Sequence, residues 1–409
     1  VIKNKTFFFY NMEWRKYIDG GSTNQTVPDP STYGGDFSSV TAPIMVPDAT
    51  RVAPSVLFAN CPGGAAPAGI TQGAQFPGNV IPSCMINPNA TALLGTGFLP
   101  TPNGAFDPTT GATPFVGGAN SATNLKEEMV RIDHHFSDKF SVFGHFIAEQ
   151  ISQGYNTSQW SGDNLPTVGD TFNNPAYSYT IHATHSISPS VLNEIAFNYN
   201  GNRINITPYA ATGMKSLSLP TCSAPCDFTN ARFFTGPNPM DRIPNITLDK
   251  QSNANFQIAS WPWVNRADGY QIRDDVSWTK GAHQIKIGGS WALYKKKQQL
   301  FGTTQGAFTF EGNNQSYTGN SFADFLLGTA SSYSELAVQD VRTWPNHSWG
   351  LYVQDNWRVN NRLTLNLGLR WDGIPHAYEV NNKMGNFYPN LYDPSQAATV
   401  DAAGNVCST

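Results

Sequence analysis

The stretch Leu363-Thr-Leu-Asn-Leu-Gly-Leu-Arg-Trp371 decides how this chain folds, because apolar side chains occupy every second position in it. Successive side chains of a β-strand point to opposite faces, so this segment has one apolar face and one polar face. The polar face extends to the flanking residues Arg362 and Asp372. The pattern predicts a strand over 362–372 whose two faces meet different environments.

The segment just before it, 348–358, repeats the alternation. Trp, Leu and Val fill its apolar positions, with Asp355 as the exception. Val359-Asn360-Asn361 joins the two segments, and asparagine tolerates the positive φ angles of a tight turn. The two segments are therefore predicted to form an antiparallel hairpin.

Similar alternation recurs along most of the chain. It predicts strands near 5–12, 125–133, 139–149, 177–187, 190–200, 269–279, 282–295, 348–358 and 362–372. Short turns near 134–139, 187–190, 279–282 and 359–361 join them in pairs, whereas long polar connections rich in Gly and Pro cover 13–124, 151–176, 202–267 and 297–346. Several unstructured connections longer than about 15 residues are rare in a compact soluble domain. They are usual in a barrel with tight turns on one membrane side and long loops on the other.

The bilayer explains why such strands would be needed. In hydrocarbon every backbone N–H and C=O must be paired within the protein, which strands achieve only in a closed ladder. About ten tilted residues cross the apolar band, with an apolar outer face and a polar lumen. The predicted fold is all-β: an incomplete antiparallel transmembrane β-barrel over 1–409, about nine strands of a larger barrel. Its turns would be periplasmic and its long loops extracellular.

The composition fits a surface that does not face water alone. Charged residues make up 13% of the 409 residues, against about 25% in a typical soluble domain, and aromatic residues make up 12%. A net charge of −4 argues against a nucleic-acid partner, which requires a basic surface. No run of about 18 apolar residues predicts a transmembrane helix. We interpret both ends as cuts through a longer protein, since the chain lacks a signal peptide and a terminal strand.

Four of the five cysteines form two local pairs in loop-like sequence. The disulfide candidates are Cys61 with Cys84 and Cys222 with Cys226, and free thiols are the alternative. A four-cysteine zinc site would need two CxxC-like knuckles, which neither pair supplies.

Three motifs in chain order resemble one family. Ile2-Lys-Asn-Lys-Thr-Phe-Phe-Phe9 resembles the segment that opens the barrel of TonB-dependent receptors in the Oar-like branch with a carboxypeptidase regulatory-like domain. Ser321-Phe-Ala-Asp-Phe-Leu-Leu-Gly328 is similar to a loop motif of that branch. Tyr352-Val-Gln-Asp-Asn-Trp-Arg358, followed by 362–370, resembles its most recurrent hairpin.

The resemblance implies active uptake of a large nutrient, such as a glycan, peptide or siderophore, across the bacterial outer membrane. A complete relative has a plug domain, a TonB box and a barrel of about 22 strands. This chain shows no plug, no TonB box and no C-terminal strands. Its own plug and TonB in the full-length protein are therefore the partners that the resemblance implies, and the ligand would meet the long loops.

The polar face supplies the candidate site. The residues predicted to face the lumen are Glu194, Asn198, Arg273, Asp275, Lys286, Gln354, Asn356, Arg358, Asn366, Arg370 and Asp372. Such a wall of mixed sign could be hydrated, contact a plug or touch substrate. The lysine run 295–297 lies just past an apolar band and could be solvated or contact lipopolysaccharide phosphate.

No catalytic, metal or cofactor site is expected. The chain has no G-x-S-x-G nucleophile elbow, P-loop or Rossmann fingerprint. His182 and His185 form an HxxH, but residues three apart on a strand face opposite sides. Asp133-His134-His135 is predicted to be a solvated cap at a turn. Two alternatives to the transporter stay open: a passive porin or outer-membrane adhesin, and a secreted β-rich glycan-binding protein or hydrolase.

Overall fold

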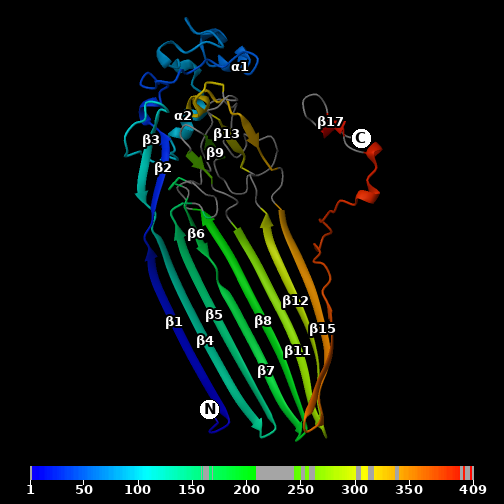
Figure 1. Ribbon diagram of the computed structural model, residues 1–409. Coiled ribbons are helices and arrows are strands. Elements are labelled where there is room, and N and C mark those ends of the chain that lie inside the picture. The colour runs from blue at the N-terminus through cyan, green and yellow to red at the C-terminus, as the bar shows by residue number, and fades with distance from the viewer. Residues whose placement is uncertain are drawn as a thin grey trace.

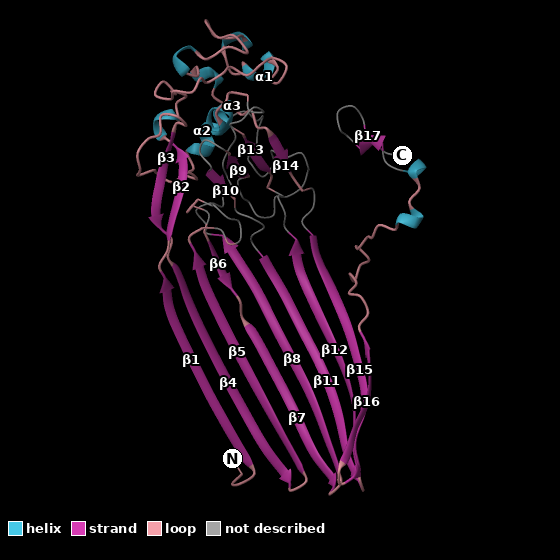
Figure 2. Cartoon of the chain, in the orientation of Figure 1, coloured by secondary structure: helices cyan, strands magenta, loops and turns pink. Residues whose placement is uncertain are grey.

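Long antiparallel strands dominate the computed structural model (Figures 1 and 2). The structure describes residues 2–157, 159, 165–167, 169–208, 244–249, 254–257, 263–300, 305–311, 317–336, 340–396, 399–400 and 406–407. One ten-stranded sheet runs β1-β4-β5-β6-β8-β11-β12-β15-β16, with β7 pairing β5 and β8. Its strands are β1 (Thr6–Asp19), β4 (Ser121–Ser137), β5 (Phe140–Tyr155), β6 (Asp170–Asn173), β7 (Ala176–Ser188), β8 (Val191–Pro208), β11 (Trp263–Lys280), β12 (His283–Leu300), β15 (Asp340–Asn360) and β16 (Leu363–Gly373).

The strands β6 and β7 occupy one position in the sheet, since both pair with β5 on one side and β8 on the other. Pro175 lies in the break between them and cannot donate a ladder hydrogen bond. The carbonyl of Pro175 still accepts a hydrogen bond from Arg203 N (2.9 Å). The ten strands thus fill nine positions along the sheet, which matches the number of strands that the alternation predicts.

Tight turns join four hairpins at one end of the sheet. Two residues separate β4 from β5, β7 from β8, β11 from β12, and β15 from β16. Gly281 has a φ of 60° in the third of these turns, a conformation that glycine adopts without steric cost. All four turns lie at the lower end in Figure 1, where the N-terminus also lies.

Most of the strands are longer than the alternation predicts. The strand β15 has 21 residues, whereas the sequence predicts 348–358, and β1, β8 and β12 also continue beyond their predicted ends. Both faces of these extensions carry polar residues, so the alternation fades while backbone pairing continues. The register from Lys295↔Pro345 to Leu300↔Asp340 shows that the ladder persists there.

The sheet is open. Among the described residues, β1 pairs with β4 alone and β16 with β15 alone, so the barrel is not closed. The upper half of β15 extends beyond β16, and the segment 374–383 lies against it. Val380 N donates to Thr343 O (3.1 Å), and Asn346 Nδ2 donates to Pro375 O (2.8 Å).

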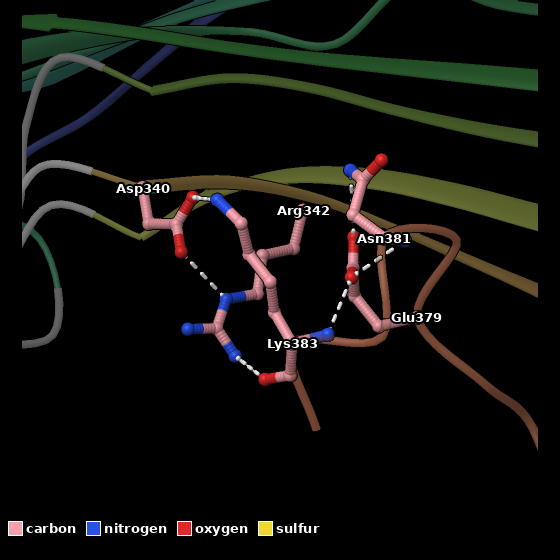
Figure 3. Close-up of polar contacts among 5 residues, drawn as sticks. All are labelled: Asp340, Arg342, Glu379, Asn381 and Lys383. Carbon is pink, nitrogen blue, oxygen red and sulfur yellow. Dashed lines mark hydrogen bonds and ion pairs between the residues drawn. The ribbon is translucent and has the colours of Figure 1, made fainter. Parts of the chain in front are cut away.

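Ion pairs hold this returning segment in place (Figure 3). Asp340 accepts from Arg342 Nε at 2.8 Å and lies 3.4 Å from Lys383 Nζ. Arg342 also donates to the carbonyl of Lys383 (2.7 Å). Glu379 accepts from the backbone N–H groups of Asn381 (2.8 Å) and Lys383 (3.0 Å).

The long connections are not structureless, which corrects the sequence-based expectation. Their described residues gather into one cap over the end of the sheet opposite the turns (Figure 1). The cap contains β2 (Ser22–Pro28), β3 (Ala112–Gly118), β9 (Asn245–Leu248), β10 (Ala254–Phe256), β13 (Ala307–Phe310), β14 (Ser332–Ser334), α1 (Pro54–Leu57), α2 (Pro88–Leu94), α3 (Ser321–Leu327) and the 3-10 turns Pro30–Thr32, Pro62–Gly64, Pro77–Asn79 and Ser83–Met85. The sequence did not predict the cap, because the apolar residues of these connections are scattered between Gly and Pro and follow no period.

All four of these connections share a single core, since Leu165 of the connection 151–176 packs with residues of the other three. Its buried side chains include Val27, Phe37, Ile44, Phe76, Ile81, Leu248, Phe256, Phe310, Phe322 and Phe325. The strands β9 and β13 pair in parallel although about 60 residues separate them in the chain. The cap is thus built by contacts between residues far apart in sequence.

The helix α3 lies at the centre of the cap. Asn320 caps its N-terminus by accepting from the N–H groups of Phe322 (3.0 Å) and Ala323 (3.1 Å). Gly328 ends it with a φ of 73°. All seven residues of Ser321–Leu327 are buried. The motif at 321–328 is therefore a buried helix with both ends capped, not a surface loop.

Short elements follow the last long strand: the 3-10 turns Pro389–Leu391 and Pro394–Gln396, and the strands β17 (Thr399–Val400) and β18 (Val406–Cys407). None of the helices in the described ranges is long and apolar enough to cross a membrane.

Candidate functional site

The strand register puts the eleven predicted lumen residues on one face of the sheet. Directly paired residues of an antiparallel sheet share a face, so parity can be followed from strand to strand. Asp372 pairs with Gly350, Gly350 with Ser290, Ser290 with Arg273, and Arg273 with Ala196. The same face carries the other nine predicted residues, since each lies an even number of positions from one of these: Glu194, Asn198, Asp275, Lys286, Gln354, Asn356, Arg358, Asn366 and Arg370. We call this surface the polar face.

Asp275 is the centre of the polar face. The Asp275 side chain is only 2% exposed. The carboxylate accepts from Tyr352 Oη (2.6 Å) and lies 3.0 Å from Arg273 Nε and 3.9 Å from Lys286 Nζ. A buried carboxylate needs such partners, because an unpaired buried charge is costly. Gly288, opposite Asp275, leaves room for this arrangement, since a Cβ there would meet Asp275 Oδ1 at 2.1 Å.

A second ion pair lies on β16. Arg370 donates to both oxygens of Asp372 through Nε (2.8 Å) and Nη2 (2.7 Å). Its guanidinium lies 5.9 Å from the ring centroid of Tyr352, so Tyr352 lies between the two groups. Four neighbouring strands, β11, β12, β15 and β16, thus supply one polar network of fixed geometry.

The polar face extends to further residues on β4, β5 and β7, of which Arg131 and Phe143 were not singled out from the sequence. His182 lies 3.8 Å from Glu194, and Arg131 donates to both oxygens of Asp133 (2.9 and 2.7 Å). The Arg131 guanidinium also lies 4.1 Å from the centroid of Phe143. The alternation could have identified these residues, because each occupies a polar-face position of its own strand.

The two histidines of the HxxH lie on opposite faces. His182 pairs with Ala196 on the polar face, whereas His185 pairs with Asn193 on the other. They cannot converge on one metal ion. The residues 133–135 belong to β4 rather than to the turn, and Thr6 Oγ1 lies 2.8 Å from His134 Nδ1. This corrects the expected turn position.

The other face of the sheet is apolar, and we call it the apolar face. Phe197 and Leu367 on it are 41% and 54% exposed, and Ile285 and Leu365 are half-buried. None of the four lies in a protein interior. Asp274 and Asp355 interrupt this face, and both are paired: Asp274 with Asn193 Nδ2 (2.5 Å) and Asp355 with His283 Nδ1 (2.6 Å).

The cap carries a cavity of about 240 Å³. Aromatic side chains from three elements line it: Phe308 and Phe310 of β13, Phe325 of α3 and Tyr333 of β14. Asn87 and Gln305 add amide groups to the wall. An apolar cavity with a few polar groups is the usual form of a small-ligand site, so the cap offers a second candidate binding surface.

A disulfide cross-links the part of the cap that the connection 13–124 supplies. Cys61 and Cys84 are bonded with an S–S distance of 2.01 Å and close a segment with a sequence separation of 23. Cys222 and Cys226 lie outside the described residues. In the same region burial raises the pKa of Tyr33 to about 12, with the Asp29 carboxylate adding to the shift.

Residues 1–408 match a family model described as an outer membrane beta barrel domain. No curated protein matches the sequence. Among solved structures, the outer membrane transporter YddB from Escherichia coli shares 13% sequence identity at a TM-score of 0.38. The alignment covers 64% of this chain and 28% of that chain.

Proposed function

The chain belongs to the outer membrane beta barrel domain family, and from that premise we propose that it is part of a TonB-dependent transporter. It would supply wall and extracellular loops of a receptor that takes up a large nutrient such as a glycan, a peptide or a siderophore. The family places the chain in the bacterial outer membrane, which leaves the secreted alternative without support.

One observation carries the proposal: the ten-stranded sheet, which we call the wall, has two faces of opposite chemistry from β4 to β16. The polar face offers fixed, mixed charges such as the Asp275 network, which a hydrated interior can solvate. The apolar face offers side chains such as Ile181, which is 56% exposed and suited to lipid. Such a wall needs an aqueous interior, as an uptake channel has.

The cap supports uptake rather than free diffusion. It is a packed body with its own core at the end of the wall opposite the tight turns (Figure 2), which would be the extracellular end, and its cavity has aromatic and amide lining. A loop cluster of this kind can select a ligand before entry. A passive pore has no need of it, and for that reason the porin is our second candidate.

The test uses a strain that lacks the full-length gene and the same strain carrying it on a plasmid. We expect the complemented strain to accumulate a labelled oligosaccharide, peptide or siderophore, and a protonophore or loss of TonB to abolish the accumulation. Uptake that persists without energy would favour the porin. Surface binding without entry would favour the adhesin.

A further inference from the structure

The outward side of the wall carries a row of cations next to a row of aromatic rings. On the apolar face, paired residues form rows across β8, β11, β12 and β15. One row contains Tyr199, Tyr270, Leu293 and His347. The next row towards the cap contains Gly201, Asp268, Lys295 and Pro345, and the row after that contains Arg203, Arg266, Lys297 and Thr343.

The aromatic row has the composition of an interface belt at the edge of a membrane. Tyr179, Tyr199 and Tyr270 lie side by side on three strands, with ring centroids 5.5 and 5.1 Å apart. Tyrosine prefers the level of the lipid headgroups, where its ring meets apolar chains and its hydroxyl meets water. Residues two apart on a strand are about 6.7 Å apart, so the two charged rows begin where headgroups begin.

The charge of these two rows is strongly positive. They hold four cations and one carboxylate, so their formal sum is 4 − 1 = +3. Arg203 is committed to Asp268 (2.7 Å) and also donates to Tyr199 Oη (3.2 Å). Arg266, Lys295 and Lys297 are exposed. Glu379 lies near Thr343 at the edge of β15, but it is 1% exposed and accepts from backbone N–H groups.

We infer that Arg266, Lys295 and Lys297 form a binding site for the phosphate groups of lipopolysaccharide on the outer side of the wall. The cap lies at the end of the sheet opposite the tight turns (Figure 1). The inference rests on the proposed function in taking this end as extracellular, so that the rows face the outer leaflet, whose lipid A carries phosphates just outside the acyl chains. Arg and Lys bind phosphate through charge-assisted hydrogen bonds. The neighbouring tyrosine row provides an apolar surface for the acyl chains. The site does not depend on transport, since it faces lipid and not the lumen.

The lysine run supplies its own control. Lys296 lies between Lys295 and Lys297 on the same strand, but it pairs with Ala267 and Trp344 on the polar face. Substituting Lys296 removes the same charge from the same segment without touching the outer surface. If only the total charge mattered, substituting any of the three lysines would weaken lipid A binding equally. The proposed site predicts a loss for Lys295 and Lys297 but not for Lys296.

The experiment measures lipid binding to the full-length protein purified in a neutral detergent, by native mass spectrometry. The probes are diphosphoryl lipid A, dephosphorylated lipid A, phosphatidylglycerol and inorganic phosphate. We expect diphosphoryl lipid A to bind most tightly. The variant R266Q/K295Q/K297Q should bind it about 100-fold more weakly, because each cation near a lipid surface contributes about fivefold. K296Q should stay within about twofold of the parent.

Three results would overturn the inference: equal binding by the triple variant, an equal loss in K296Q, or phosphatidylglycerol binding as tight as that of lipid A. Complete displacement of lipid A by inorganic phosphate would indicate a free-anion site instead and would also overturn it. Heat-modifiable migration in gels reports that each variant is folded. If the triple variant does not fold, K295Q and K297Q are measured singly. A loss of about fivefold in each is then expected, and no loss in either refutes the site.

Discussion

The wall and the cap of this molecule are stabilised in opposite ways. In the wall, large apolar side chains point outward, and Ile181 is 56% exposed while Asp275 is 2% exposed. In the cap, apolar side chains point inward, and Phe322 is 2% exposed. Lipid serves as the apolar medium for the wall, whereas the cap must make its own core. Substitutions of equal chemistry should therefore act differently in the two regions.

The largest effect should come from emptying the cap core. Phe322 packs between Tyr33, Phe37 and Phe325, with ring centroids 5.4, 6.4 and 5.7 Å away. We expect Phe322→Ala to destabilise the cap by about 3–5 kcal/mol, because the cavity cannot collapse fully. Limited proteolysis of the full-length protein would show faster cleavage within the cap. Unchanged protection of the cap would mean that Phe322 is not a central core residue.

Removal of the disulfide should loosen the cap without harming the wall. The disulfide closes a segment with a sequence separation of 23. On the chain-entropy model it raises the free energy of unfolding by about 3 kcal/mol, because it restricts the unfolded chain. We expect Cys61→Ser and Cys84→Ser to raise protease sensitivity equally, and the double variant to be no worse than either single one. Wall folding, read by heat-modifiable migration, should be unchanged. A wall defect in these variants would show that the two regions fold as one unit.

A lysine introduced on the apolar face should destabilise the wall more than a lysine introduced on the polar face. Ile181 and Thr180 are neighbours on β7, and Ile181 pairs with Phe197 while Thr180 pairs with Asn198. We expect Ile181→Lys to destabilise the wall by about 2 kcal/mol, because it places a cation in lipid. Thr180→Lys, its matched control on the polar face, should cost much less. Urea unfolding in lipid vesicles measures both, and equal losses would contradict the assignment of the faces.

The smallest expected effect is a loss of cap stability at low pH. Hydrogen bonds from Thr50 to Asp48, and from Thr109 and Thr110 to Asp107, hold the pKa of both cap carboxyls below the ordinary 3.8. Their contribution to folding is complete above that value and is lost as the pH falls through the lowered pKa. Proteolysis of the cap should therefore increase slightly below about pH 3.8. Asp48→Asn and Asp107→Asn together should flatten this dependence, and an unchanged pH profile would assign it to other groups.

The sequence predicted the wall well and the cap poorly. The hairpin of β15 and β16 could be read from 348–372 because one face must be apolar and the other polar at each step. The same rule placed Arg273, Asp275 and Arg370 on one face before their partners were known. It could not show that Tyr352 donates to Asp275, since a tyrosine on a polar face fits several roles. The cap has no periodic pattern, because its core residues come from irregular segments.

What the amino-acid sequence determined by itself is the alternation of faces and the positions of the tight turns, since both depend on neighbouring residues. The tertiary structure alone decided that β9 pairs with β13, that Ser321–Leu327 is a buried helix, and that Arg266 and Lys297 lie side by side. These arrangements join residues distant in the chain. Their free energy depends on which surfaces meet, and local sequence does not encode that choice.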